Sequence, residues 1–135
     1  MLRMTSIVLG LAAASPALAF VAENSHEVNA LSDGRDFEVV GRVGSGPADY
    51  FCAASHYAQA VLRAPVASRV SVLRAYGSSQ TAPGARAVSF TVDDGSGRRP
   101  GQNMNYSLSV EEPGFNLSIG MARSFCDDDL PEWMW

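Results

Sequence analysis

The stretch Pro47–Arg63, PADYFCAASHYAQAVLR, decides the fold, because it carries the clearest helical pattern in the chain. A proline at the first helical position and an acidic residue in the first turn are typical of a helix start. Pro65 pushes the residue before it out of the α region, so the helix is expected to end before Ala64. The apolar residues recur at helical spacing and form one stripe, which predicts a helix that packs on another layer. The stripe consists of Phe51, Ala54, Ala58, Val61 and Leu62.

The sequence on either side of this helix predicts β-strands. Before it, Phe37–Val43 is rich in β-branched and aromatic residues, and Phe20–Asp36 is a polar, extended lead-in with at most one short strand. After it, four runs alternate apolar and polar residues with a period of two, which is typical of half-buried strands. The four runs are Arg69–Tyr76, Arg86–Asp93, Asn105–Glu111 and Phe115–Met121.

A tight turn at Glu112-Pro113-Gly114 predicts a hairpin between the last two of these runs. The elements together predict an α+β fold in the order β-α-β-β-β-β. In this fold one helix packs on the apolar face of a four- to five-stranded, mainly antiparallel sheet. The other face of the sheet carries serine and threonine and is expected to be open to water.

Cys52, in the predicted helix, and Cys126, after the last predicted strand, are the two cysteines of the chain. In an oxidising compartment an even pair is most simply a structural disulfide. Such a bond would join the helix layer to the sheet layer and close a loop of about 75 residues, for which loop-closure entropy gives about 4 kcal/mol of stabilisation. The sequence therefore predicts one disulfide, Cys52–Cys126.

A second interpretation starts from the spacing of Cys52 and His56, which lie four residues apart on one helix face. A thiol beside an imidazole is a nucleophile pair, and the same two side chains are half of a zinc site. Zinc needs further ligands, and His26 is the other imidazole of the chain. Thiol and zinc chemistry are kept as alternatives to the disulfide, while the leading interpretation includes no metal and no cofactor.

The first 19 residues, MLRMTSIVLGLAAASPALA, have the pattern of a secretory signal peptide. Arg3 supplies the positive start, Ile7–Ala14 the short apolar core, and Ala17-Leu18-Ala19 the small-x-small cleavage pattern. Cleavage after Ala19 would leave residues 20–135 as a single exported α+β domain, periplasmic or secreted, with no membrane span. Retention of residues 1–19 as an uncleaved anchor is the alternative, although polar residues and a proline dilute the apolar run.

The charge of the chain disfavours two classes of partner. Without the leader it has nine arginines, no lysine and 14 acidic residues, so its net charge is about −5. Nucleic-acid affinity comes mostly from contacts between phosphates and basic side chains, so an acidic chain without a basic stripe is a poor candidate. Anionic membrane surfaces attract basic segments for the same reason. Binding to nucleic acid or to such membranes is therefore not expected.

Two further features have both a functional and a structural interpretation. Trp133, Met134 and Trp135 are costly to leave in water, so they either pack on the core or bind a partner. Four arginines near the helix end and the strand starts either form an anion pocket or pair separately with acidic residues. These arginines are Arg63, Arg69, Arg74 and Arg86.

A final pattern is spread over four segments: Ala48–Ala54, Tyr57-Ala58, Gly77–Thr81 and Val88–Val92. Together they resemble an uncharacterised set of small exported bacterial proteins. The resemblance covers most of the chain after the leader. It implies a small exported domain with a cysteine in its helix, and it carries no activity.

The sequence contains no ordered catalytic triad signature and no phosphate-binding loop with a lysine. The leading hypothesis is a non-enzymatic periplasmic domain that binds another protein or an envelope component, with Trp133, Met134 and Trp135 as candidate contacts. The alternatives are a small envelope hydrolase, a thiol enzyme that uses Cys52 and His56, and an inhibitor of a secreted hydrolase. The sequence does not identify the partner, the biological process or the oligomeric state.

Overall fold

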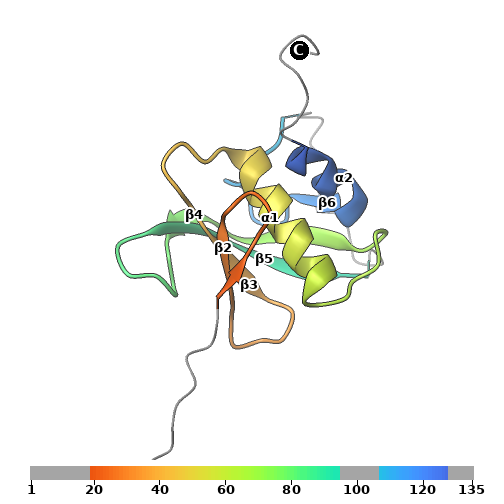
Figure 1. Ribbon diagram of the computed structural model, residues 1–135, viewed down its shortest axis with the longest axis horizontal. Coiled ribbons are helices and arrows are strands. Elements are labelled where there is room, and N and C mark those ends of the chain that lie inside the picture. Colours follow the sequence, from red (N-terminus) through yellow and green to blue (C-terminus); the bar gives the residue numbers. More distant parts are fainter. Residues whose placement is uncertain (1–18, 95–106, 128–135) are drawn as a thin grey trace, which may run out of the picture.

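The computed structural model describes residues 19–94 and 107–127, which form a six-stranded antiparallel sheet with one long helix across one face (Figure 1). The strands follow one another across the sheet in the order β1-β2-β3-β5-β4-β6. The short helix α2 lies beside the long helix α1. The elements are β1 (Phe20–Val21), β2 (Glu27–Ala30), β3 (Phe37–Val40), α1 (Pro47–Ala60), β4 (Arg69–Ser78), β5 (Arg86–Asp93), β6 (Asn116–Ser118), α2 (Ile119–Arg123) and the 3-10 helix η1 (Ser124–Cys126).

The predicted α+β class is confirmed, with one main helix on an antiparallel sheet and a disulfide between Cys52 and Cys126. Helix α1 begins at Pro47, as its sequence predicts, and β5 has the predicted bounds. The Asp49 carboxylate accepts the N–H of Gly46, the N-cap residue, at 2.8 Å. This side chain closes the first turn of the helix.

The core lies between α1 and the sheet, and three phenylalanine rings form its centre. Phe37 of β3, Phe51 of α1 and Phe90 of β5 are fully buried. The centroid of the Phe90 ring lies 5.2 Å from that of Phe51, edge to face, and 6.0 Å from that of Phe37. Because β5 alternates, Val88 and Val92 share the helix-facing side of the strand with Phe90. The Phe90 ring therefore joins Phe51 of the helix to Phe37 of the neighbouring strand.

The predicted element order is wrong at the N-terminal end. The lead-in Phe20–Asp36 contains two strands, β1 and β2, which pair with each other, and β2 also pairs with β3. Each is too short for a period of two to be recognised, since β1 has two residues and β2 has four. Pairing with β3 nevertheless buries Val28 of β2 completely, and this burial explains why a polar segment is part of the sheet.

The C-terminal end also differs from the prediction. The run Phe115–Met121 begins as the three-residue strand β6 and then turns into α2. Ser118 causes the change, because its hydroxyl accepts the N–H of Met121 at 3.1 Å and caps the new helix. The alternation of apolar and polar residues predicts a longer strand here, because Ser118 fits the polar face of a strand as well as it caps a helix.

The hairpin expected at Glu112-Pro113-Gly114 does not form. Residues 107–111, the described part of the strand expected at Asn105–Glu111, are irregular. The carbonyl oxygen of Val110 accepts the N–H of Tyr76 at 2.9 Å, and β6 pairs with β4. The segment therefore runs along the edge of β4, whose unpaired backbone groups it satisfies.

The face of the sheet away from α1 is less open than predicted, because the loop between β4 and β5 folds over part of it. Glu38 and Ser89 on this face are 1 % and 3 % exposed. The backbone N–H of Gln80 donates to both Glu38 carboxylate oxygens, at 2.9 and 3.2 Å, and its side-chain amide donates to Ser89 at 3.2 Å. A glutamate and a serine that alternation places in water are therefore covered and hydrogen-bonded.

No helix among residues 19–94 and 107–127 is long and apolar enough to cross a membrane. The predicted leader, apart from Ala19, lies outside the described residues. The signal peptide, its cleavage after Ala19 and the single domain over residues 20–135 therefore stay predictions.

Gly41, just after β3, leaves no room for a side chain. A Cβ atom there would overlap the Tyr50 hydroxyl and lie 3.3 Å from the carbonyl oxygen of Arg86. We expect Gly41→Ala to lower the free energy of unfolding by about 1–3 kcal/mol, as overpacking does, measured by urea denaturation. Gly34→Ala is the control, because no atom lies within 4 Å of the added Cβ. Equal stability of the two variants would contradict this packing.

Candidate functional site

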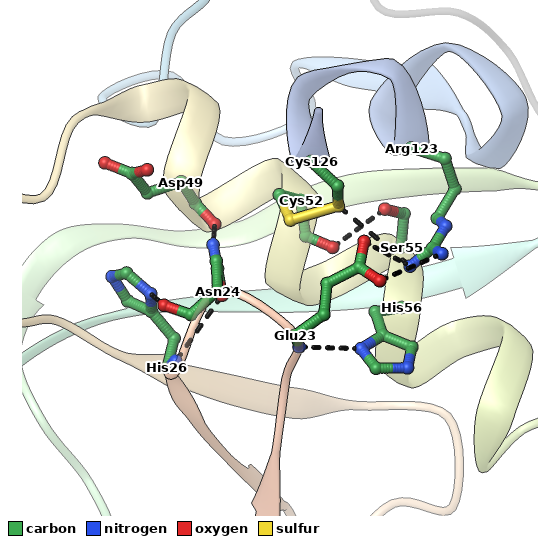
Figure 2. Close-up of polar contacts among 9 residues, drawn as sticks. All are labelled: Glu23, Asn24, His26, Asp49, Cys52, Ser55, His56, Arg123 and Cys126. Carbon is green, nitrogen blue, oxygen red and sulfur yellow. Dashed lines mark hydrogen bonds and ion pairs between the residues drawn. A yellow bond between two sulfur atoms is a disulfide. The ribbon is translucent and has the colours of Figure 1, made fainter. Parts of the chain in front are cut away.

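The Cys52–Cys126 disulfide lies at the corner where α1 meets the C-terminal elements (Figure 2). Cys52 is fully buried in the second turn of α1, and Cys126 is half-buried at the end of η1. Their Cα atoms are 4.9 Å apart, and 74 residues separate them in the sequence. The predicted bond is therefore present. It ties the helix to the segment that follows the last strand.

A charged pair lies beside the disulfide. Glu23, in the turn between β1 and β2, forms an ion pair with Arg123 of α2 at 3.1 Å (Figure 2). A guanidinium nitrogen of Arg123 also lies 4.0 Å from the sulfur of Cys126. The two side chains are 40 % and 31 % exposed, so water screens the pair and its contribution to stability is small. Its importance is positional, since it places a carboxylate and a cation next to the two sulfurs.

His56, one helical turn after Cys52, belongs to the same corner but does not form a nucleophile pair with it. Its Nδ1 accepts the backbone N–H of Glu23 at 3.0 Å, so this ring nitrogen carries no proton. The Phe20 ring packs edge-on against it, with centroids 5.0 Å apart. Cys52 has no thiol in this state, because its sulfur is bonded to Cys126. His56 instead fastens the β1–β2 turn to α1.

The zinc set suggested by Cys52, His56 and His26 is not assembled, because His26 points to Ser45 near the start of α1. In the described part of the chain, the group with closely spaced ligand atoms is Glu23, Cys52 and Cys126, all within 4.8 Å of one another. Metals bind cysteine as the thiolate. In the oxidised protein these sulfurs are therefore not metal ligands.

His26 and Ser45 form a close pair that the sequence does not reveal, because 19 residues separate them. His26 Nδ1 lies 3.2 Å from the carbonyl oxygen of Asn24, and His26 Nε2 lies 2.7 Å from the hydroxyl oxygen of Ser45. A carbonyl cannot donate, so we assign the proton to Nδ1, and Nε2 accepts from the hydroxyl. A serine hydroxyl on an oriented imidazole is the arrangement of an activated nucleophile.

The other contacts of Ser45 give it a structural role. Its hydroxyl oxygen accepts the backbone N–H of Arg42 at 2.9 Å while the hydroxyl donates to His26 Nε2 at 2.7 Å. These two bonds fix the orientation of the hydroxyl. His26, which is 5 % exposed, covers it from the other side. The pair joins the loop before α1 to the β1–β2 turn.

The same turn also reaches the first turn of α1 through Asn24, whose amide donates to the carbonyl oxygen of Asp49 at 2.8 Å (Figure 2). Asp49 itself caps the helix through its carboxylate. A helix N-terminus attracts anions through its free N–H groups and its dipole. Here the chain supplies the negative charge itself, so the start of α1 is already compensated.

Two of the four arginines considered as an anion pocket, Arg69 and Arg86, do not share a site. Arg69 lies opposite Asp93 at one end of the β4–β5 pair, and Arg86 lies opposite Ser78 at the other end. The Arg69 guanidinium donates to the side chain of Asn116. Because β4 and β5 run the length of the sheet, the two strand-end arginines face different parts of the surface.

A second candidate site, the Tyr76–Arg86 surface, lies at the end of the sheet next to the start of α1. The Arg86 guanidinium lies over the Tyr76 ring, 5.0 Å from its centroid, and Tyr76 is 38 % exposed. The Tyr76 ring also packs edge-on against the ring of Tyr50 of α1, with centroids 6.2 Å apart. The Arg86 carbonyl oxygen accepts the N–H of Gly41 at 2.8 Å, which brings the exposed residues after Gly41 to the same end. The surface consists of Arg42, Val43, Tyr76 and Arg86.

The predicted partner-binding residues Trp133, Met134 and Trp135 lie outside the described residues, so their role stays a prediction. Comparison of the chain with protein-family models, with curated proteins and with solved structures finds no match in any of the three. The function is therefore argued from the side chains of this chain.

We expect the folded, unreduced protein to contain no free thiol, because Cys52 and Cys126 are bonded to each other. Thiol titration in denaturant and intact mass before and after reduction measure this directly. The double variant Cys52→Ser/Cys126→Ser is expected to lose about 2–5 kcal/mol of unfolding free energy, since it releases a long loop. Two reactive thiols in the untreated protein would contradict the disulfide.

From the raised pKa values of Tyr50 and Tyr57 we expect the protein to lose stability at alkaline pH. Burial raises the pKa of Tyr50 above its ordinary value of 10.0, with smaller contributions from Tyr76 and Asp49, and burial also raises the pKa of Tyr57. A pKa that is higher in the folded state favours folding below the unfolded value, and this advantage is lost as pH rises through the folded value. We therefore expect the unfolding free energy to fall above about pH 10. Tyr50→Phe should make this fall less steep in urea denaturation, and an unchanged slope would contradict the assignment.

Proposed function

We propose that this chain is a non-enzymatic exported domain, periplasmic or secreted, that binds another protein or an envelope component. The observation that carries the proposal is the exposed contact between Tyr76 and Arg86. A ring and a guanidinium that already touch present apolar area and charge together, and they lose little side-chain freedom on binding. Tyrosine and arginine are also enriched among the residues that contribute most to protein interfaces.

The charge of the Tyr76–Arg86 surface favours a partner with acidic groups. Neither Arg42 nor Arg86 forms an ion pair with another residue of the described ranges. The planar guanidinium matches carboxylate and phosphate groups with two parallel hydrogen bonds. Val43, the most exposed large apolar side chain of the described residues, follows Arg42 in the chain and offers apolar area. We therefore propose that the partner presents a carboxylate or a phosphate next to an apolar group.

Binding is preferred to catalysis because the candidate nucleophiles are occupied. Cys52 is bonded to Cys126, which leaves the thiol enzyme without a thiol in the oxidised state. The Ser45 hydroxyl is hydrogen-bonded to the backbone N–H of Arg42 as well as to His26, and His26 is only 5 % exposed, which weakens the case for a hydrolase. An inhibitor of a secreted hydrolase is a narrower form of the same binding proposal, in which the partner is an enzyme.

Export is supported in part by two observations. A disulfide between Cys52 and Cys126, and a described chain without a membrane-spanning helix, are both compatible with an exported protein. Assignment to the periplasm or the medium rests on the leader pattern of residues 1–19 and on the resemblance to small exported proteins. Trp133, Met134 and Trp135 are proposed as a second contact region of the same binding function.

The test is capture from an envelope extract on immobilised protein, with quantification by mass spectrometry. We expect the wild-type chain to retain a specific protein or envelope component that Tyr76→Ala/Arg86→Ala does not retain. Each of these substitutions is expected to cost more than tenfold in affinity if its side chain is a central contact. The melting temperature of each variant is measured beside the capture, because Tyr76, 38 % exposed, also packs against Tyr50, and loss of capture counts only in folded protein.

Arg35→Ala is the matched control, since Arg35 is an exposed arginine in the turn between β2 and β3. It should retain the captured partner. Deletion of Trp133–Trp135 tests the second region separately. Loss of capture in that deletion, with full capture in the Tyr76→Ala/Arg86→Ala variant, would move the site away from the Tyr76–Arg86 surface. Turnover of an ester substrate that depends on Ser45 would contradict a non-enzymatic role.

A further inference from the structure

We propose that the corner around the disulfide becomes a Zn²⁺ site when the disulfide is reduced, with Cys52, Cys126 and Glu23 as its ligands. The two sulfurs and a carboxylate oxygen of Glu23 lie within 4.8 Å of one another (Figure 2). They come from α1, η1 and the β1–β2 turn, so the tertiary fold brings them together. Zinc binds thiolate sulfur at about 2.3 Å and carboxylate oxygen at about 2.0–2.2 Å, which places two tetrahedral sulfur ligands about 3.8 Å apart. The sulfurs are bonded to each other in the disulfide, so reduction must let them separate before one ion can lie between them and Glu23.

The zinc site exists only when the disulfide between Cys52 and Cys126 is reduced. A dithiol reductant gives two electrons and two protons to the Cys52–Cys126 bond, which becomes two thiols while the reductant becomes a cyclic disulfide. Zinc then displaces both thiol protons, which pass to the buffer, and the two thiolates with the Glu23 carboxylate give the bound site a net charge of about −1. Water completes the tetrahedral coordination. In the oxidised protein no thiolate is present and the corner binds no zinc.

Arg123 is the competitor of the metal. In the oxidised protein it holds the Glu23 carboxylate at 3.1 Å and lies 4.0 Å from the sulfur of Cys126. Zinc must take Glu23 away from this guanidinium and must bind close to a positive charge. Removal of the charge therefore tightens binding, whereas removal of the Glu23 carboxylate weakens it. If zinc bound only to the two cysteines of an unfolded chain, neither change would alter its affinity.

The experiment uses the purified full chain, reduced with dithiothreitol and freed of it by anaerobic desalting. Zinc is titrated against a chromogenic chelator, and Co²⁺ serves as a spectroscopic probe for metal–thiolate bonds. We expect one ion per reduced chain and none per oxidised chain. Glu23→Gln should weaken binding at least tenfold, and Arg123→Gln should tighten it severalfold. Glu27→Gln, a change in an exposed glutamate of β2, is the control and should leave the affinity unchanged.

Circular dichroism of the reduced chain shows whether the fold persists. If the reduced chain unfolds and binds zinc through its cysteines alone, Glu23→Gln and Arg123→Gln will bind as the wild type does, and the proposal is overturned. Equal binding by oxidised and reduced protein would also overturn it. The result does not depend on the proposed partner-binding function, because the Tyr76–Arg86 surface shares no residue with the proposed zinc site.

Discussion

The covalent bond between Cys52 and Cys126 is the constraint on which the C-terminal part of this fold depends. Helix α2 has five residues and η1 has three, and helices of this length are marginal in isolation. Ile119 and Ala122 bury their side chains in the core and add apolar contact. The disulfide fixes the end of this segment on α1, while the pairing of β6 with β4 fixes its beginning. The segment from β6 to η1 is thus attached to the sheet at its beginning and to α1 at its end.

The N-terminal turn is held in a different way, by polar groups that each find one specific partner. Asn24 bonds to the first turn of α1, His26 to Ser45, and the backbone of Glu23 to His56. Ser25 adopts a positive φ of 68°, which a residue other than glycine rarely does, and these surrounding bonds maintain it. Hydrogen bonds of this kind lose most of their value when one partner is removed, because the other stays buried. The same bonds also position Glu23 beside the sulfurs.

The main helix, the strands β4 and β5 and the disulfide could be predicted, because each has a local signature. Pro47 and Pro65 delimit the helix, and alternation over eight residues or more marks the two long strands. The short strands β1, β2 and β6 depend on pairing with neighbours that are distant in sequence. The His26–Ser45 pair joins two loops, and no motif connects them. The exposed position of Tyr76 follows from two irregularities in β4, between Val72 and Arg74 and between Arg74 and Gly77, where simple alternation fails.

The sheet ends in very short strands on both sides, two residues in β1 and three in β6. A sheet edge recruits another chain through its row of free N–H and C=O groups, and these edges offer few of them. Extension of the sheet by a foreign strand, and fibre-like stacking of copies through their edges, therefore have little backbone to build on. In the proposed binding function, the contacts made by residues 19–94 and 107–127 would therefore rest on side chains, whose chemistry discriminates between ligands more sharply than a backbone ladder does.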